Sequence, residues 1–230
     1  MGYQKRIVCL ANSRKPGGRC VAGKETIQGG YGSWIRPVSA RPGAEVNVEE
    51  RQYENGGDPS ILDILDISML APVPKVHQVE NHMIDPHFYW TRRGAIGWED
   101  IAGLVDAPVT LWGTGVSTYH GHNDQITPAD AAAFQNSLCL VQPENLSIQV
   151  LTPGAAFGNN KRKVRASFRY RGVPYNLMVT DPSVENAFLA RPNGDYPIHV
   201  PTYLSVSLTE AHTDNYCYKL IATVISEQPL

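Results

Sequence analysis

The sequence lacks long apolar runs, is poor in cysteine and contains no complete catalytic signature, and each absence excludes a class of protein. No apolar run approaches the ~20 residues that a membrane-spanning helix needs. The four cysteines, Cys9, Cys20, Cys139 and Cys217, form no C-x-x-C pair, which excludes a zinc ribbon and a disulfide-rich secreted module. The apolar run at residues 7–11 is too short for a secretion signal. We therefore expect a reduced, cytoplasmic protein without a membrane partner.

Charged side chains are also scarce, at 18% of the 230 residues, and the formal net charge is −2. This composition is typical of a globular chain and excludes disorder and a coiled coil. Turn-forming residues are abundant, with 20 glycines and 17 prolines between short apolar runs rich in valine, isoleucine and tyrosine. Because long helical periodicity is scarce, the pattern predicts a mainly β fold with short helices.

Short apolar patterns in the first 70 residues predict strands. Residues 7–11 and 19–22 flank a polar, glycine-rich stretch and are typical of the two arms of a hairpin. Residues 34–38 form another strand pattern, and residues 61–70 favour a strand over a helix because prolines follow them. The polar, acidic segment 45–58 predicts a solvated loop.

Two short helices and one strand are expected before a junction at Pro143. The first helix covers residues 98–105. Thr127 as N-cap, with Pro128 at the first helical position, begins the second helix, which we expect to end near Gln135. Residues 138–141 then form a strand before the junction.

Beyond this junction the chain is nearly all β, with a turn at residues 171–174 and a short helix at 182–189. Five strands with one helix are the elements of a small Greek-key barrel. We therefore expect two barrels in tandem, residues 1–142 with a helical insert and residues 143–230. The strands expected in the second barrel are 146–151, 163–170, 175–180, 203–208 and 216–225.

The densest cluster of cations is the segment 161–171, KRKVRASFRYR. In a strand, the apolar residues at its even positions would face the core and the cations would face outward. No acidic residue lies between Glu144 and Asp181, so this row suits a phosphate backbone. It can equally be a solvated strand face that protects a sheet edge. The candidate contact residues are Lys161, Arg162, Lys163, Arg165, Arg169 and Arg171.

A second group of cations surrounds the glycine-rich segment 12–24. Gly18–Lys24 matches the beginning of a P-loop, but Glu25 stands where the Mg²⁺-binding Ser or Thr is required, which argues against nucleotide hydrolysis. A basic loop with a nearby tryptophan can still contact phosphates and stack on a base. As a structural alternative, Trp34 is a core aromatic residue. The candidate contact residues here are Arg14, Lys15, Arg19, Lys24, Trp34 and Arg36.

Histidines at 77, 82, 87, 120 and 122 provide no complete metal site or catalytic site. His120 and His122 have a spacing that two metal ligands can use, but order along the chain identifies no third ligand. Cys20 beside Arg19 has no base assigned to it by a known spacing. We therefore assign no catalytic residue, no metal and no cofactor.

Several segments resemble the prokaryotic dual OB-containing domain family. The resemblance spans essentially the whole chain and implies two tandem OB-like barrels without established enzymatic chemistry. It also implies nucleic-acid recognition, often in bacterial systems directed against phage. The segments that carry it are LANSRK at 10–15, GRCVAG at 18–23, WIRPVS at 34–39, ENH at 80–82, VSL at 206–208 and YCYKLIA at 216–222.

The sequence thus predicts a non-catalytic module that binds single-stranded DNA or RNA, with an effector protein as a further partner. One alternative is an enzyme that uses the Asn12–Lys24 loop with Cys20 and one of the histidines. Another is an adaptor whose basic strand docks on an acidic protein surface.

Overall fold

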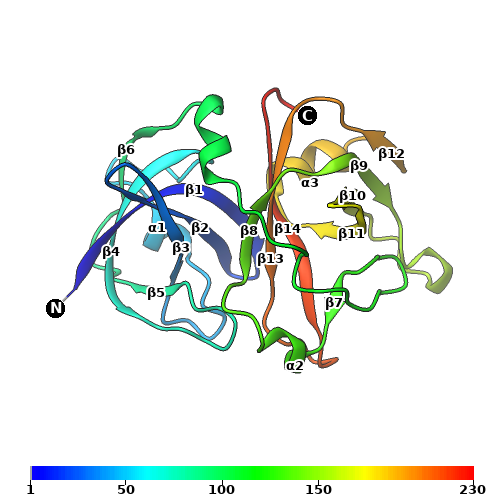
Figure 1. The fold of residues 1–230 in the computed structure, drawn as a ribbon, viewed down its shortest axis with the longest axis horizontal. Coiled ribbons are helices and arrows are strands. Elements are labelled where there is room, and N and C mark those ends of the chain that lie inside the picture. Colours follow the sequence, from blue (N-terminus) through cyan, green and yellow to red (C-terminus); the bar gives the residue numbers. More distant parts are fainter. Residues whose placement is uncertain (1) are drawn as a thin grey trace. The chain divides into compact units, whose positions relative to one another are not determined.

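The computed structural model describes residues 2–230, which divide into two compact units (Figure 1). Unit 1 extends to Val105 and includes Gln135–Ser137, and unit 2 comprises Asp106–Phe134 and Leu138–Leu230. The sequence places a helical insert at residues 98–135 of the first barrel, and residues 106–134 of this insert have their contacts in unit 2. The division after residue 142 stays a proposal for where the strands of the second barrel begin. Met1 lies outside the described residues.

Unit 1 is a ring of five strands to which a sixth is added. The strands pair in the order β1-β2-β3-β5-β4-β6, and β1 also pairs with β4, which closes the ring. Only the β3–β5 pair among these is parallel. The strands are β1 (Tyr3–Lys15), β2 (Gly18–Ile27), β3 (Gly30–Val38), β4 (Asp63–Pro72), β5 (Asn81–Ile84) and β6 (Thr91–Ala95).

Strand β1 closes this ring because it is long enough to serve two neighbours. Its first half pairs with β4, and the part from Ile7 onward pairs with β2. A register shift between Cys9 and Ala11 bends the strand, as β-bulges do. Side chains at alternate positions of β1 and β4 point inward, so the core of unit 1 follows a two-residue period. Its buried members include Ile7, Cys9, Val21, Ile35, Leu65, Ile67 and Met69.

Unit 2 repeats this strand order with different lengths. The order is β12-β9-β10-β11-β14-β13-β8, with β11 and β14 parallel. Strands β12 and β13 follow each other along the chain and pair with β9 and β14 respectively, so together they close a second ring. Its strands are β9 (Glu144–Leu151), β10 (Lys163–Tyr170), β11 (Val173–Val179), β12 (Gly194–Pro197), β13 (Thr202–Leu208) and β14 (Cys217–Ser226), with β7 (Gln125–Ile126) and β8 (Leu138–Val141) added outside the ring.

A helix separates the third and fourth strands of each ring. In unit 2 this is α3 (Pro182–Leu189), whose N-cap Asp181 accepts hydrogen bonds from the Ser183 and Val184 backbone nitrogens, as Asp does at many helix starts. In unit 1 it is α1 (Val48–Arg51), held by a capping box between Asn47 and Glu50. The prediction of a loop throughout 45–58 is therefore wrong at α1.

Most other predicted elements are confirmed, and the misses are short. The 98–105 segment is a 3-10 helix, η1 (Trp98–Leu104), and Thr127 does cap α2 (Pro128–Ala131), which ends four residues before the expected Gln135. A further 3-10 turn, η2 (Ala155–Phe157), and strands β5, β6, β7 and β12 were not expected. No helix among residues 2–230 is long and apolar enough to cross a membrane.

Candidate nucleic-acid interface

The end of the β1–β2 hairpin brings three predicted contact residues together. Arg14 and Arg19 are opposite each other in the antiparallel register, and Lys15 lies opposite Gly18. Arg14 is exposed, and Lys15 and Arg19 are half-buried. Cations directly opposite each other repel, so this arrangement favours an anionic group nearby. The Glu45 carboxylate of the same unit lies against Gly17 at this turn. At this hairpin end, the cations that the sequence predicts for the surface of unit 1 are at least partly exposed.

Other predicted contact residues of unit 1 are buried. Lys24 is 9% exposed, with its Nζ 6.0 Å from the centroid of the Trp34 ring, and Trp34 is 8% exposed. Gly18–Lys24 is part of strand β2, so no P-loop exists there. The prediction that Lys24 is presented at the surface is therefore wrong, whereas the alternative of Trp34 as a buried aromatic is confirmed.

Arg36 is also buried, because it belongs to a polar cluster within unit 1. Its Nη2 lies 3.0 Å from Glu80 Oε1 and donates to Ser137 Oγ at 2.8 Å. Its Nη1 donates to Asn81 Oδ1 at 3.3 Å. A buried arginine of this kind is held by its carboxylate partner, which is distant in sequence. The expectation that Arg36 is presented to a ligand is wrong.

In unit 2, the alternation predicted for the basic strand holds on its inner side. The β10 residues on this side are buried in the core of unit 2, namely Val164, Ala166, Phe168 and Tyr170. On the outer side Arg169 is exposed and Lys163 half-buried, and the flanking Lys161 and Arg171 are exposed. Arg171 and Gly172 have positive φ angles of 50° and 76°, which form the tight turn into β11.

Arg165 departs from the outward row, since it is only 5% exposed. Its Nη2 donates to Asp124 Oδ2 at 2.6 Å and to the Asn176 carbonyl at 2.6 Å, and its Nε donates to Asn176 Oδ1 at 2.7 Å. Thr118 donates to Asp124 through its backbone nitrogen and its hydroxyl. The segment before β7 thus covers Arg165, and the prediction that Arg165 is exposed is wrong.

Arg162 has a structural role as well. Its Nη1 donates to the Leu189 carbonyl at 2.8 Å, its Nη2 to the Arg191 carbonyl, and its Nε to Asn193 Oδ1 at 2.9 Å. These carbonyls lie at the C-terminal end of α3, where cationic side chains satisfy the last backbone acceptors. Arg162 therefore fixes the helix end, although sequence order alone placed it in the basic row.

The His120-Gly121-His122 motif is explained by packing. A Cβ atom on Gly121 would lie 1.8 Å from Asp124 Oδ2, so only glycine fits beside this carboxylate. His120 Nε2 is 2.8 Å from the Pro153 carbonyl, and His122 pairs with Asn176 through the backbone. Within residues 2–230, no group of three or more His, Cys, Asp and Glu side chains could hold a metal ion.

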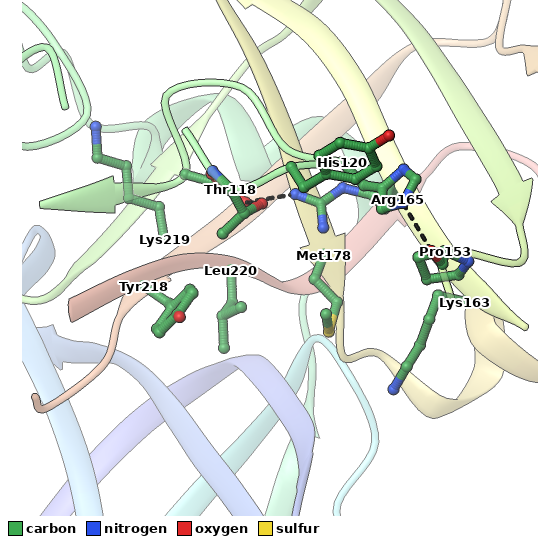
Figure 2. A pocket seen from close by; sticks show the side chains of 11 residues that line it. Thr118, His120, Pro153, Lys163, Arg165, Met178, Tyr218, Lys219 and Leu220 are labelled. Atoms are coloured by element: carbon green, nitrogen blue, oxygen red, sulfur yellow. Dashed lines mark hydrogen bonds and ion pairs between the residues drawn. The ribbon is translucent and has the colours of Figure 1, made fainter. Parts of the chain in front are cut away.

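A pocket of about 240 Å³ opens on the outer face of unit 2, next to Arg165. Figure 2 shows Met178 and Leu220 on one side of it, with Arg165 and Lys163 around its edge. The Lys219 side chain leaves β14 on the side opposite to Tyr218 and Leu220 (Figure 2). The pocket therefore combines an apolar surface with two cationic side chains.

Lys219 is fully buried on the inner side of β14. Its Nζ donates to the Gly113 carbonyl at 3.0 Å and to Asn123 Oδ1 at 2.8 Å, both uncharged acceptors. Burial lowers the pKa of Lys219 to about 7, against a smaller opposing effect of the Asp124 charge. The sequence contains no signal for this buried amine, because the residues that surround it come from remote segments.

The thiols and His82 have environments that bear on the enzyme alternative. Burial raises the pKa of the Cys9 thiol to about 12 and also raises that of Cys217. Cys20 is half-buried. The Tyr3 hydroxyl and His82 Nδ1 are joined by a hydrogen bond of 2.5 Å. Burial lowers the pKa of His82. His82 is therefore paired with a tyrosine and not with the thiol that this alternative invokes.

Unit 1 also carries a set of arginines that were not expected from the sequence. Arg6 and Arg93 both bind the buried carboxylate of Asp66, with nitrogen–oxygen distances of 2.6 Å. Arg92 binds Asp63 at 2.6 Å. The three arginine side chains are about half-exposed, so their outer edges can meet solvent or a ligand. The signal in the sequence was the presence of two acidic residues, Asp63 and Asp66, inside the otherwise apolar strand β4.

A protein-family comparison matches residues 5–224 to the dual OB-containing domain. Searches of curated proteins and of solved structures find no match. The match covers nearly the whole chain, and the two closed rings agree with the tandem OB-like barrels expected from the sequence. In OB-folds, the face of the second and third strands and the loops at its ends bind oligonucleotides or oligosaccharides. The chain belongs to the dual OB-containing domain family.

Proposed function

We propose that this chain binds single-stranded nucleic acid without catalysing a reaction. The observation that carries the proposal is the position of three exposed cations, Lys161, Arg169 and Arg171, along and beside β10. Strand β10 is the second strand of its barrel, and the second and third strands form the ligand face of OB-folds. Cations on a rigid strand can follow a phosphate backbone.

The hairpin end of unit 1 supports the same function. Arg14, Lys15 and Arg19 lie where the first strand of that barrel turns into the second, at a loop that OB-folds use for ligands. Of the twelve contact residues predicted, the proposal keeps these three together with Lys161, Lys163, Arg169 and Arg171. A cytoplasmic location and a role in recognising phage nucleic acid beside an effector protein complete the proposal.

The test is fluorescence anisotropy with labelled single-stranded DNA, single-stranded RNA and duplex, from low to physiological salt. We expect saturable binding to a single strand, with log affinity falling linearly with log salt concentration. Removing two cations in the variant Arg169→Gln/Arg171→Gln should weaken binding and make the slope shallower by about 0.7 for each lost phosphate contact. Thermal unfolding should change little, because both side chains are exposed.

The matched control is Lys5→Gln/Arg41→Gln, which removes the same charge from unit 1. Both of these cations already bind carboxylates, those of Glu25 and Glu50. We expect this control to keep the wild-type salt slope. Equal slopes for both double variants would contradict the proposal, and a protein partner that survives nuclease treatment in a pull-down would favour the adaptor.

A further inference from the structure

We propose that the exposed rings of Phe157 and Tyr119 stack on bases of a single-stranded nucleic acid, and that Lys161 contacts one of its phosphates. The proposal rests on the proposed function, because it assigns base contacts on unit 2 to the nucleic acid whose backbone the cations follow. Neither aromatic residue is among the contact residues expected from the sequence.

The loop between β9 and β10 presents Phe157 to solvent. Phe157 is 86% exposed, and all residues of the segment 155–161 are exposed. An aromatic ring in water gains free energy when a ligand covers it. The faces of nucleic-acid bases are planar and stack on aromatic side chains whatever the base sequence. In OB-folds the loop between the first and second strands is one of the ligand-binding loops, and β9 and β10 are these strands in unit 2.

The turn that carries the Phe157 ring is closed by hydrogen bonds. The backbone nitrogens of Phe157 and Asn159 donate to the Gly154 carbonyl at 2.9 and 3.0 Å. A Cβ atom on Gly154 would lie 2.6 Å from Asn159 Cβ, so this close approach requires glycine. Gly158 follows the ring with a φ angle of 74°, in the left-handed region that glycine favours. Because the turn is already ordered, stacking of a base costs little conformational entropy.

One amide side chain joins the two ends of this loop. Asn193 Nδ2 donates to Thr152 Oγ1 at 3.0 Å, and Asn193 Oδ1 accepts a hydrogen bond from Arg162 Nε at 2.9 Å. Arg162 also donates to carbonyls at the end of α3. The loop is therefore fixed to the barrel at both ends, and the side chains that fix it add no negative charge.

The segment that carries Tyr119 is attached to the beginning of the same loop. His120 Nε2 lies 2.8 Å from the Pro153 carbonyl oxygen (Figure 2). Tyr119 is 91% exposed, and its ring meets the His120 ring edge to face with the ring centroids 4.6 Å apart. Pro153 precedes Phe157 by four residues, which span at most about 14 Å of extended chain. The two exposed rings are therefore within reach of one short single strand.

Lys161 gives the loop a cation beside the ring. It is exposed, and no ion pair of its side chain is found among residues 2–230. No acidic residue lies between Glu144 and Asp181, so the loop contains none. Single-strand-binding surfaces combine stacking rings with cations that meet phosphates, and this loop carries both. An apolar protein surface would cover the ring but would leave the Lys161 charge without a counterion.

The experiment removes one ring at a time with Phe157→Ala and Tyr119→Ala, and Phe157→Tyr keeps a ring in place. Anisotropy at low salt compares a labelled single strand carrying bases with a strand of equal length built from abasic units. We expect each alanine variant to weaken binding of the base-bearing strand about tenfold, the loss of one stacked base, and to leave the abasic strand unaffected. Phe157→Tyr should bind both strands as the wild type does.

The matched control is Phe88→Ala, the same substitution at a phenylalanine of unit 1 that is 58% exposed. It should bind both strands as the wild type does. Lys161→Gln should weaken binding of both strands by the same factor, because a phosphate contact does not depend on a base. All of these side chains are exposed, so thermal unfolding should change little in each variant.

The outcomes separate failure of the stacking proposal from failure of the proposed function. Wild-type affinity of Phe157→Ala for the base-bearing strand overturns stacking and leaves strand binding intact. Equal weakening on both strands also overturns stacking, because the loss would not depend on bases. If the wild type binds neither strand at low salt, the proposed function fails and stacking fails with it. A protein that the wild type captures after nuclease treatment, and that Phe157→Ala does not, would assign the ring to the adaptor alternative.

Discussion

Replacing Arg165 with methionine is expected to lower the free energy of unfolding of unit 2 by about 3–5 kcal/mol. The side chains of Arg165 and Asp124 are only 7% and 4% exposed and form an ion pair at 2.6 Å. Methionine fills a similar volume but leaves the Asp124 carboxylate buried with the donors of Thr118 alone. Loss of one member of a buried pair is costly because the remaining charge loses its ion-pair partner and is in contact with little water.

Urea unfolding at constant pH measures this loss, with Arg169→Met as the control on the same strand. Arg169 is exposed, so its replacement should change the free energy of unfolding by no more than about 0.5 kcal/mol. If the two units unfold in separate transitions, only that of unit 2 should move. Equal losses for Arg165→Met and Arg169→Met would show that the buried pair is not formed in solution.

Lys219 is expected to make the protein more stable at pH 9 than at pH 7. The folded-state pKa is about 7, whereas an unfolded lysine titrates near 10.4, so between these values the unfolded chain binds the extra proton. Stability therefore rises with pH across this window, by about 2–3 kcal/mol from pH 7 to pH 9 at 1.36 kcal/mol per pH unit. Lys219→Met, which has no proton to bind, should lack this rise.

The difference between wild type and Lys219→Met isolates the lysine from the thiols. The raised pKa values of Cys9 and Cys217 make the free energy of unfolding fall as pH rises. Above the pKa of an unfolded thiol, the unfolded chain loses protons that the buried thiols keep. Both thiols are present in both proteins, so their effects cancel in the difference. Urea unfolding at several pH values between 6 and 9 makes the measurement. Parallel pH profiles for the two proteins would contradict a neutral buried amine.

The strands and helix caps could be predicted because their signals are local. Alternation in β10 and the Thr127-Pro128 start of α2 each depend on residues within a few positions of one another. The short strands β5 and β12 have only four residues each, too few for a periodic pattern to stand out. Pairing with neighbouring strands, rather than their own sequence, determines them.

The candidate site could be predicted only where exposure follows from alternation. Arg169 is exposed as expected, but Arg165 on the same strand face is covered by Asp124, 41 residues earlier in the chain. Arg36 is likewise covered by Glu80, whose carboxylate lies 3.0 Å from it. A run of cations without acids in its own segment does not show which acids the fold brings to it.

The strand order of unit 2 also has a consequence for synthesis of the chain. Strand β14 lies between β11 and β13, yet it is synthesised after both of them. Until it emerges, β11 and β13 each present an unpaired edge, and such edges promote association between nascent chains. In unit 1, β5 likewise pairs with two strands that precede it, β3 and β4, but β5 is complete at residue 84. Translation speed through β14 should therefore matter more for the yield of folded protein than speed through β5.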